Sequence, residues 1–227
     1  MELNSARNRE DELSTLKPLG PTDVDPAKIV SIKHALHIVP SDYIDSNRKI
    51  LFDPHKGLTM NEVLDKRREG FVNVIPGLEE RSWLSELFSC CSTRDHKQEA
   101  YAKIIRKHLS SKSTVIRDGN KVSVDREELV PGDILVLSKG DKVNADTLLL
   151  EISKGEHKLA VNAFLYTESN TPYDKEIIHS IGDPWDRQEF LLTGTEVVAG
   201  GGKALVLAVG KDTAVGMIMK SFGNRKQ

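Results

Sequence analysis

The sequence has few cysteines and no long apolar run, and each of these features excludes a class of protein. Among its 227 residues only Cys90 and Cys91 are cysteines, and they are adjacent. An ordinary disulfide framework is therefore excluded, and a reducing compartment is expected. No apolar run approaches the roughly 18 residues of a membrane helix, and residues 1–20 are too polar for a signal peptide. We therefore expect neither a span nor a leader.

Net charge and histidine spacing exclude two further classes. The 32 Lys and Arg residues nearly balance the 34 Asp and Glu residues, for a formal net charge of -2. This balance gives no electrostatic reason to expect a nucleic-acid partner. The 7 histidines do not fall at metal-ligand spacings, so no metal site is predicted.

Changes in composition and in the period of the apolar residues divide the chain into five parts. Residues 1–24 lack a sustained apolar period and are expected to form a flexible tail, followed by a helical region over residues 25–92. A basic amphipathic helix is predicted within residues 93–112. Residues 113–222 have the short alternating period of strands and form the main domain, and residues 223–227 are a second tail.

The clearest helix start in the first half is at Thr59. Thr59 and Glu62 stand at the reciprocal spacing of a capping box. The helix that follows is predicted to turn Val63 and Leu64 toward a core. Gly70 suits the left-handed residue just past a helix end, so this helix is expected to be short.

The basic helix begins near Asp95, which with Gln98 forms another possible capping pair. Its lysines and arginines lie mostly away from the apolar residues, which recur at helical spacing. Two interpretations stay open: a solvated basic face over a packed apolar one, or a helix on a membrane surface. The apolar residues are Ala100, Ile104, Ile105 and Leu109.

From residue 113 onward, strands alternate with glycine turns. Asp118 and Gly119 can supply the positive φ angles of a tight hairpin turn. Three consecutive glycines at 200–202 are predicted to be a turn rather than a phosphate cradle, because no Lys-Ser or Lys-Thr pair follows and no helix opens there. The further strands are expected within residues 129–137, 147–152, 190–198, 204–209 and 217–218.

Five segments occur in a fixed order and spacing: residues 115–119, 129–133, 140–146, 159–172 and 193–218. Together they resemble the actuator domain of P-type cation-transporting ATPases. The helix at Lys56-Gly57-Leu58-Thr59 is similar to the amino-terminal domain of the type II members, and Gln98-Glu99-Ala100 resembles a stalk of the Na,K/H,K branch. The resemblance implies an α+β fold, with a distorted jelly-roll-like β domain preceded by short amino-terminal helices.

The resemblance also implies which parts of a pump this sequence does not carry. In the family two membrane helices separate the segment ending near Phe88 from the stalk near Gln98, whereas residues 89–97 join them here. The acceptor motif Asp-Lys-Thr-Gly-Thr does not occur, and the family binds ATP and Mg²⁺ in domains outside this stretch. We therefore expect no cofactor in this chain and neither pumping nor ATP hydrolysis by it alone. The expected partner is a phosphorylation domain or an intact pump, at the cytoplasmic face of a membrane.

The segment that carries catalysis in the family is altered here. The family has Thr-Gly-Glu-Ser, whose glutamate orients the water that hydrolyses an aspartyl phosphate. This chain has Thr167, Glu168, Ser169 and Asn170. Without a gap, Ser169 occupies the glutamate position; with a one-residue gap, Glu168 does and the glycine is deleted. Either register predicts an impaired dephosphorylation loop.

Two further departures from the family pattern suggest relaxed constraint. Asn144 stands where the family has a proline in the Ala-Asp turn, and Asn162 stands where it has an aspartate beside Val161. Both lie in the segments that carry the resemblance.

Two functions from different classes are compatible with this pattern. The chain is either the amino-terminal and actuator portion of a P-type pump-like protein, with a mechanical role, or a stand-alone non-catalytic protein that binds and regulates an intact pump. Cys90 and Cys91 follow an apolar stretch. They are either reduced bystanders or a dual S-acylation site that would anchor the chain to a membrane.

Overall fold

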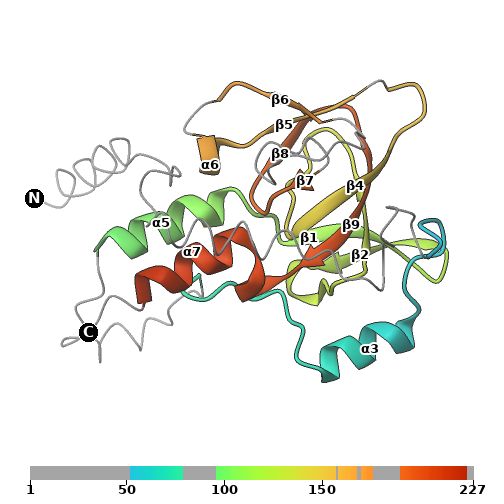
Figure 1. Cartoon of the computed structure of the whole chain (residues 1–227), viewed down its shortest axis with the longest axis horizontal. Helices are drawn as coiled ribbons and strands as arrows, with labels where there is room; N and C mark the ends of the chain where they lie inside the picture. The colour runs from blue at the N-terminus through green and yellow to red at the C-terminus, as the bar shows by residue number, and fades with distance from the viewer. Residues whose placement is uncertain (1–51, 79–95, 157, 168–169, 176–189, 224–227) are drawn as a thin grey trace, which may run out of the picture.

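Two antiparallel sheets and four helices make up the described part of the chain (Figure 1). The computed structural model describes residues 52–78, 96–156, 158–167, 170–175 and 190–223. The helices are α3 (Met60–Arg68), α5 (His96–Lys107), α6 (Phe164–Thr167) and α7 (Ala214–Gly223), with the 3-10 turns η1 (Arg126–Glu128) and η2 (Gly210–Asp212). The strands are β1 (Lys112–Arg117), β2 (Asn120–Asp125), β3 (Ile134–Leu137), β4 (Asp146–Ile152), β5 (Leu159–Asn162), β6 (Tyr173–Lys175), β7 (Phe190–Leu191), β8 (Glu196–Ala199) and β9 (Gly202–Ala208). The predicted α+β class is confirmed.

The larger sheet has the strand order β2-β1-β3-β9-β4-β7, and the smaller has β6-β5-β8. In the β1–β2 hairpin, Arg117 pairs with Asn120, and Asp118 and Gly119 have φ angles of 49° and 75°. The predicted tight turn is therefore confirmed. The turn predicted at the three glycines is also present, because it joins β8 to β9. A Cβ on Gly202 would lie 2.3 Å from the Glu151 carbonyl oxygen, so only glycine fits at this position.

The main core lies between the two sheets. It contains Val115, Leu135 and Leu149 from the larger sheet, and Val161 and Val197 from the smaller one. Burying a side chain of this kind contributes about 1.5–3 kcal/mol. The smaller sheet is therefore held firmly over the larger, and this fixes where β5 ends and α6 begins.

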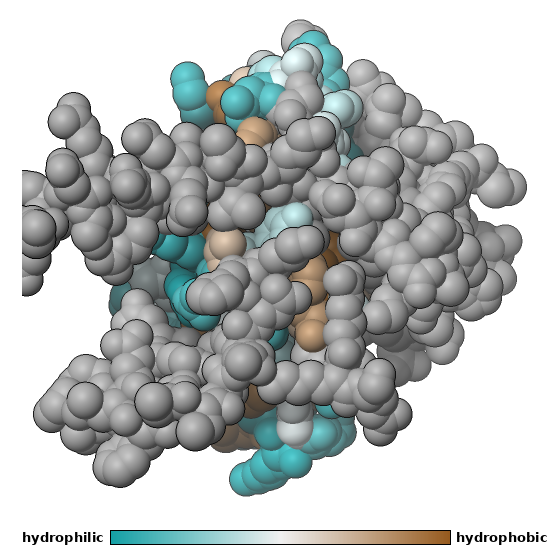
Figure 2. Space-filling model, turned by 90° about the vertical axis from the view of Figure 1, so that its left-hand side faces the viewer, coloured by the Kyte–Doolittle hydropathy of each residue, from teal (hydrophilic) through white to brown (hydrophobic). Residues whose placement is uncertain are grey.

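A second core lies between α5 and α7, which run side by side in Figure 1. Ile105 on α5 and Met219 on α7 are each only 1% exposed, and the rings of Tyr101 and Phe222 stack with centroids 5.3 Å apart. Among the helices in the described ranges, none has the length and apolarity to cross a membrane. Both hydrophilic and hydrophobic side chains of described residues are visible on the face at which these two helices end (Figure 2).

The strand predicted at Met217 and Ile218 is wrong, because both residues lie within α7. Thr213 starts this helix: its hydroxyl oxygen accepts a hydrogen bond from the Gly216 amide. Buried side chains at 214, 215, 218, 219 and 222 follow a helical period and cover the α5 side. The pattern over two residues was too short to reveal that period.

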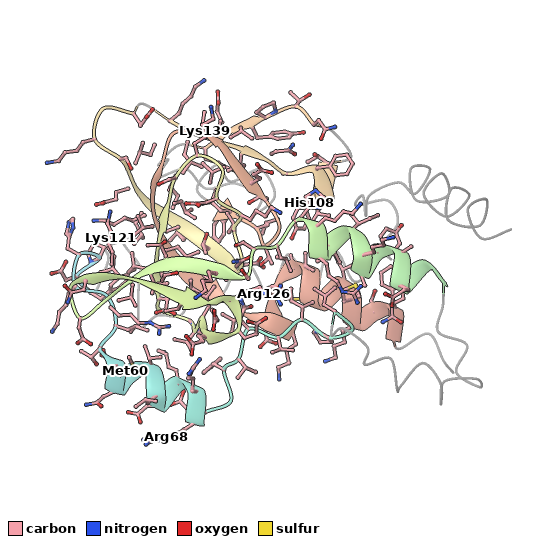
Figure 3. All side chains as sticks on the ribbon, turned by 180° about the vertical axis from the view of Figure 1, so that it is seen from behind. Met60, Arg68, His108, Lys121, Arg126 and Lys139 are labelled. Atoms are coloured by element: carbon pink, nitrogen blue, oxygen red, sulfur yellow. The ribbon has the colours of Figure 1, made fainter. Side chains whose placement is uncertain are left out.

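The helix α3 is attached to the β1–β2 hairpin. The predicted capping box is confirmed, since the Glu62 side chain accepts from the Thr59 amide and the Thr59 hydroxyl accepts from the Glu62 amide. Asp118 in the hairpin turn accepts from the Met60 amide at 3.2 Å. Figure 3 shows Met60 at the end of the helix that lies toward the hairpin. Val63 is buried as predicted, but Leu64 is 41% exposed, so its predicted core position is wrong.

Candidate functional site

The segment that resembles a dephosphorylation loop begins with a short helix rather than a loop. Strand β5 ends at Asn162, whose side-chain oxygen accepts a hydrogen bond from the Phe164 amide at 2.9 Å. This contact caps α6. The helix is a single turn, closed by the bond from the Thr167 amide to the Ala163 carbonyl.

Two buried side chains hold α6 against the rest of the domain. Leu165 packs on Gly194, where an added Cβ would lie 2.4 Å from the Leu165 Cδ1 atom. The Tyr166 hydroxyl donates to the Thr193 carbonyl at 2.7 Å. Both partners belong to the turn between β7 and β8, so this turn determines where the residues after α6 emerge.

The structure describes two of the four predicted loop residues. Thr167 is the last residue of α6, and its hydroxyl donates back to the Ala163 carbonyl at 3.1 Å. Asn170 is exposed, and its side-chain oxygen lies 3.5 Å from the Asn162 side-chain nitrogen. Glu168 and Ser169, and also Cys90 and Cys91, lie outside the described residues. The register of the altered motif therefore stays a prediction.

The β3–β4 connection contains the most densely bonded side chain near this site. Asn144 is fully buried. Its side-chain oxygen accepts from the Ser110 amide, and its nitrogen lies within donating distance of the Ser110 hydroxyl, the Lys112 carbonyl and the Ser113 hydroxyl, at 2.8 to 3.2 Å. The interpretation of Asn144 as a sign of relaxed constraint is thus wrong, because its amide joins this connection to the segment between α5 and β1.

Asn73 extends this contact to the segment that follows α3. Its side-chain nitrogen donates to the Asn144 carbonyl at 2.8 Å and to the Arg126 carbonyl, while its oxygen accepts from the Gly210 amide at 2.7 Å. The residue is only 1% exposed. One buried amide therefore joins the extended segment after α3 both to the β3–β4 connection and to η2.

Asp146, at the start of β4, forms the third contact. One carboxylate oxygen accepts from the Thr193 amide and hydroxyl, and the other accepts from the Ala214 amide at the start of α7. Burial raises the pKa of Asp146 above its ordinary value, although the hydrogen bonds from Thr193 and Ala214 act in the opposite direction. Asn73, Asn144 and Asp146 are called the polar junction below.

The end of α5 lies against both the polar junction and α6. The Lys142 ammonium donates to the Lys107 carbonyl, which is one of the carbonyls left over at the helix end. The His108 ring stacks on Phe164 with centroids 5.9 Å apart, and Figure 3 shows His108 at this end of α5. The residue that follows the predicted stalk helix is thus in contact with α6, the helix that leads into the predicted catalytic residues 167–170.

Sequence reasoning missed Tyr166 and Thr193 as site residues. Both lie next to apolar residues, and Thr193 follows the Phe190-Leu191-Leu192 run. A polar residue inside a buried run usually has a hydrogen-bond partner. The position of these two residues beside apolar neighbours could therefore have indicated buried hydrogen bonds, although not their partners. Among the described residues there is no cluster of three or more potential metal ligands.

A family model describes the part of the chain that contains these contacts. The model of the P-type ATPase actuator domain matches residues 107–222, from the end of α5 to the last turn of α7. This match covers just over half of the chain, and the observed antiparallel sheets agree with it. The chain therefore belongs to the P-type ATPase actuator domain family.

The similar proteins are cation-transporting ATPases that are much longer than this chain. A probable cation-transporting ATPase F of Mycobacterium tuberculosis is 36% identical over 132 residues, which is 57% of this chain and 14% of that protein. An endoplasmic reticulum calcium ATPase, srcA, of Aspergillus fumigatus is 32% identical over 134 residues, again 57% and 14%. A solved zinc-transporting PIB-type ATPase in the E2.Pi state has a TM-score of 0.41 and 20% identity, and the likeness covers 52% of this chain and 17% of that one.

Proposed function

We propose that this chain acts as the actuator of a P-type cation-transporting ATPase, as a mechanical part that moves as one body. The observation that carries the proposal is the polar junction. Asn73 joins the segment after α3 to the β3–β4 connection and to η2. Asn144 bonds to the residues that follow α5, and Asp146 bonds to the first turn of α7. In the family these are the segments that connect an actuator to membrane helices.

Rigid coupling is what such a role requires. A rotation can be transmitted only if the connecting segments move with the domain and not independently of it. Buried polar side chains favour one geometry strongly, because any alternative leaves their partners without hydrogen bonds. The polar junction supplies such buried polar side chains at the place where the connecting segments meet the domain.

The finer assignment is also a proposal. The resemblance of residues 56–59 and 98–100 supports a type II pump of the Na,K/H,K branch, acting at the cytoplasmic face of a membrane. The names of the similar proteins include a calcium ATPase, so we assign no ion. ATP and Mg²⁺ would be bound by a phosphorylation domain and a nucleotide-binding domain outside this chain.

The role of residues 167–170 follows from the placement of α6. The buried contacts of Leu165 and Tyr166 hold α6 in place, and Asn170 is exposed. A phosphorylated aspartate of a partner domain could meet the chain here. We propose that Glu168 or Ser169 takes the position of the family's glutamate, and that the lost Thr-Gly-Glu-Ser pattern lowers dephosphorylation strongly. The residues that form this proposed site are Thr167, Glu168, Ser169 and Asn170.

The altered loop favours one second candidate, a non-catalytic protein that binds an intact pump and changes its turnover. A domain of this fold with a weakened catalytic segment could occupy the actuator's place without completing the reaction. The proposed partner is then the phosphorylation domain of another protein. The two candidates differ in whether the chain acts within its own pump or on a separate one.

The test is a pull-down of the full chain against detergent-solubilised membranes, with P-type ATPase activity measured as the chain is added. Recovery of a pump whose turnover falls supports the regulatory candidate; recovery without a change in turnover supports the actuator role. Glu168→Ala should lower recovery, whereas Glu156→Ala, an exposed carboxylate on the β4–β5 turn, should not. If no pump is recovered under any condition, the regulatory candidate fails. The actuator candidate then depends on the rigid coupling of the three connecting segments, which hydrogen exchange tests on the chain itself.

Acylation of Cys90 and Cys91 stays a separate prediction. Two acyl chains would be enough for stable membrane attachment. Hydroxylamine cleaves thioesters, so it should release the chain from membranes if both cysteines are acylated. An unchanged membrane-bound fraction would rule the modification out.

A further inference from the structure

We propose that Asp146, Thr193 and Tyr166 form a buried relay of hydrogen bonds that fixes α6, the helix from which residues 167–170 continue, relative to the first turn of α7, with Tyr166 as the positioning residue. The relay joins two elements that are far apart in the sequence. It gives the buried carboxylate and the buried phenol a function beyond packing.

The first contact of the relay is at α7. The Asp146 carboxylate accepts from the Ala214 amide at 2.6 Å. The first amides of a helix have no partner within the helix, and they carry its positive end. An anionic oxygen at this place therefore holds the start of α7 to β4.

The second contact passes from Asp146 to Thr193. The other carboxylate oxygen accepts from the Thr193 amide at 2.8 Å and from its hydroxyl at 2.7 Å. Both residues are 0% exposed. With no water to compete, a displacement of the carboxylate must either move Thr193 or break two buried hydrogen bonds.

The third contact passes from Thr193 to α6. The Thr193 carbonyl accepts from the Tyr166 hydroxyl at 2.7 Å. Burial, and then the charge of Asp146, raises the pKa of Tyr166 well above its ordinary value. The phenol therefore stays protonated and remains a donor, and the next residue along the chain is Thr167.

The consequence is that α7 and α6 move together. A shift at the start of α7 displaces Asp146, then Thr193, then Tyr166 in α6. The inference rests on the proposed function for its purpose, since the loop matters only if it meets a phosphorylated partner. The relay itself is a property of the chain alone, and it can be tested without any pump.

The test is amide hydrogen exchange, measured by mass spectrometry on the full chain. Tyr166→Phe keeps the ring and removes only the hydroxyl, and it should raise exchange by roughly tenfold over residues 163–171 and also over residues 213–217. The β1–β2 hairpin should be unchanged. Tyr173→Phe is the matched control, because Tyr173 is 43% exposed on β6, and it should leave all three segments unchanged.

Three results would overturn the relay. An increase confined to residues 163–171 would make Tyr166 a local anchor of α6. An equal increase in the hairpin would make it an ordinary core residue. No increase anywhere would mean that the hydroxyl positions nothing.

A second pair of variants keeps the proposal testable if Tyr166→Phe does not fold. Thr193→Val removes the hydroxyl donor to Asp146 but keeps the backbone contacts, so it should raise exchange in both segments by roughly threefold. Thr193→Ser restores the hydroxyl and should return exchange to the wild-type rate. If valine and serine behave alike, the hydroxyl contact does not transmit anything and the relay is refuted. A failed pump pull-down would leave these results intact, so the two proposals fail separately.

Discussion

Asn144 in the β3–β4 connection and Asn170 in the β5–β6 connection both lie in segments where the chain departs from its family pattern. The two side chains differ in their burial and in their hydrogen bonding. Asn144 is fully buried, and its side chain has four partners. Asn170 is exposed, and its one described contact, with Asn162, is at the distance limit of a hydrogen bond. A residue that departs from the family pattern can therefore add hydrogen bonds that hold a connection in place when it is buried. An exposed one leaves its connection without such bonds.

The largest expected effect comes from removing the buried amide. Asn144→Ala would remove the side-chain partner of the Ser110 amide and one partner each of the Ser110 hydroxyl, the Lys112 carbonyl and the Ser113 hydroxyl. We expect it to lower the free energy of unfolding by about 3 kcal/mol. Asn170→Ala is the matched control and should change it by less than about 0.5 kcal/mol. Urea unfolding of the two variants measures both values. Equal losses would remove the distinction between the two connections.

A pair of glycines compares the β3–β4 connection with the β7–β8 turn, which holds α6, at the level of the backbone. Gly194 and Gly140 have φ angles of 86° and 92°, but an added Cβ meets Leu165 at the first and open space at the second. Gly140→Ala should cost about 1 kcal/mol, from the left-handed backbone alone. Gly194→Ala should cost about 2–3 kcal/mol, because it also displaces α6.

Thermal unfolding of both glycine variants, with the wild type as reference, gives these values. A Gly194→Ala variant no less stable than Gly140→Ala would mean that Leu165 is not held tightly. In that case the docking of α6, and with it the placement of residues 167–170, would need revision.

The smallest expected effect comes from a polar contact on the surface. Hydrogen bonds from the Thr59 amide and hydroxyl lower the pKa of Glu62 below its ordinary value. Because the folded-state pKa is the lower one, the stabilisation is complete above the ordinary value of 4.5 and is lost as the pH falls through the range below it. Glu62→Gln should remove this pH dependence and cost about 0.5 kcal/mol at pH 7.

The measurement is chemical unfolding of both proteins between pH 7 and about pH 3. The stabilities of wild type and Glu62→Gln should converge toward acid pH. A constant difference would show that Glu62 acts through its shape and not through its charge.

Much of this fold could be predicted from the sequence because its signals are local. The capping box at Thr59, the Asp118-Gly119 turn and the strand periods between residues 114 and 152 are each contained within a few residues, and each was confirmed. The family resemblance also rests on local segments. Local patterns failed at Met217, where two apolar residues were interpreted as a strand although α7 contains them.

The polar junction could not be predicted, because its contacts are long-range. Asn73 bonds to Gly210 and Asn144 bonds to Ser110, and no local period connects such positions. A polar residue between Val143 and Ala145 indicates only that some partner exists. The identity of the partner depends on how the sheets and helices pack.

The proposed mechanical role requires that three connecting segments are held to the domain as one rigid body. Four backbone amides donate to side chains of the polar junction: those of Ser110, Thr193, Gly210 and Ala214. Hydrogen exchange of these four amides, followed by NMR on the unmodified chain, measures this coupling. We expect all four to exchange slowly and with one common free energy, close to that of global unfolding. If the Ser110 amide opens independently while the other three stay protected, α5 is hinged on the domain and the rigid coupling is refuted.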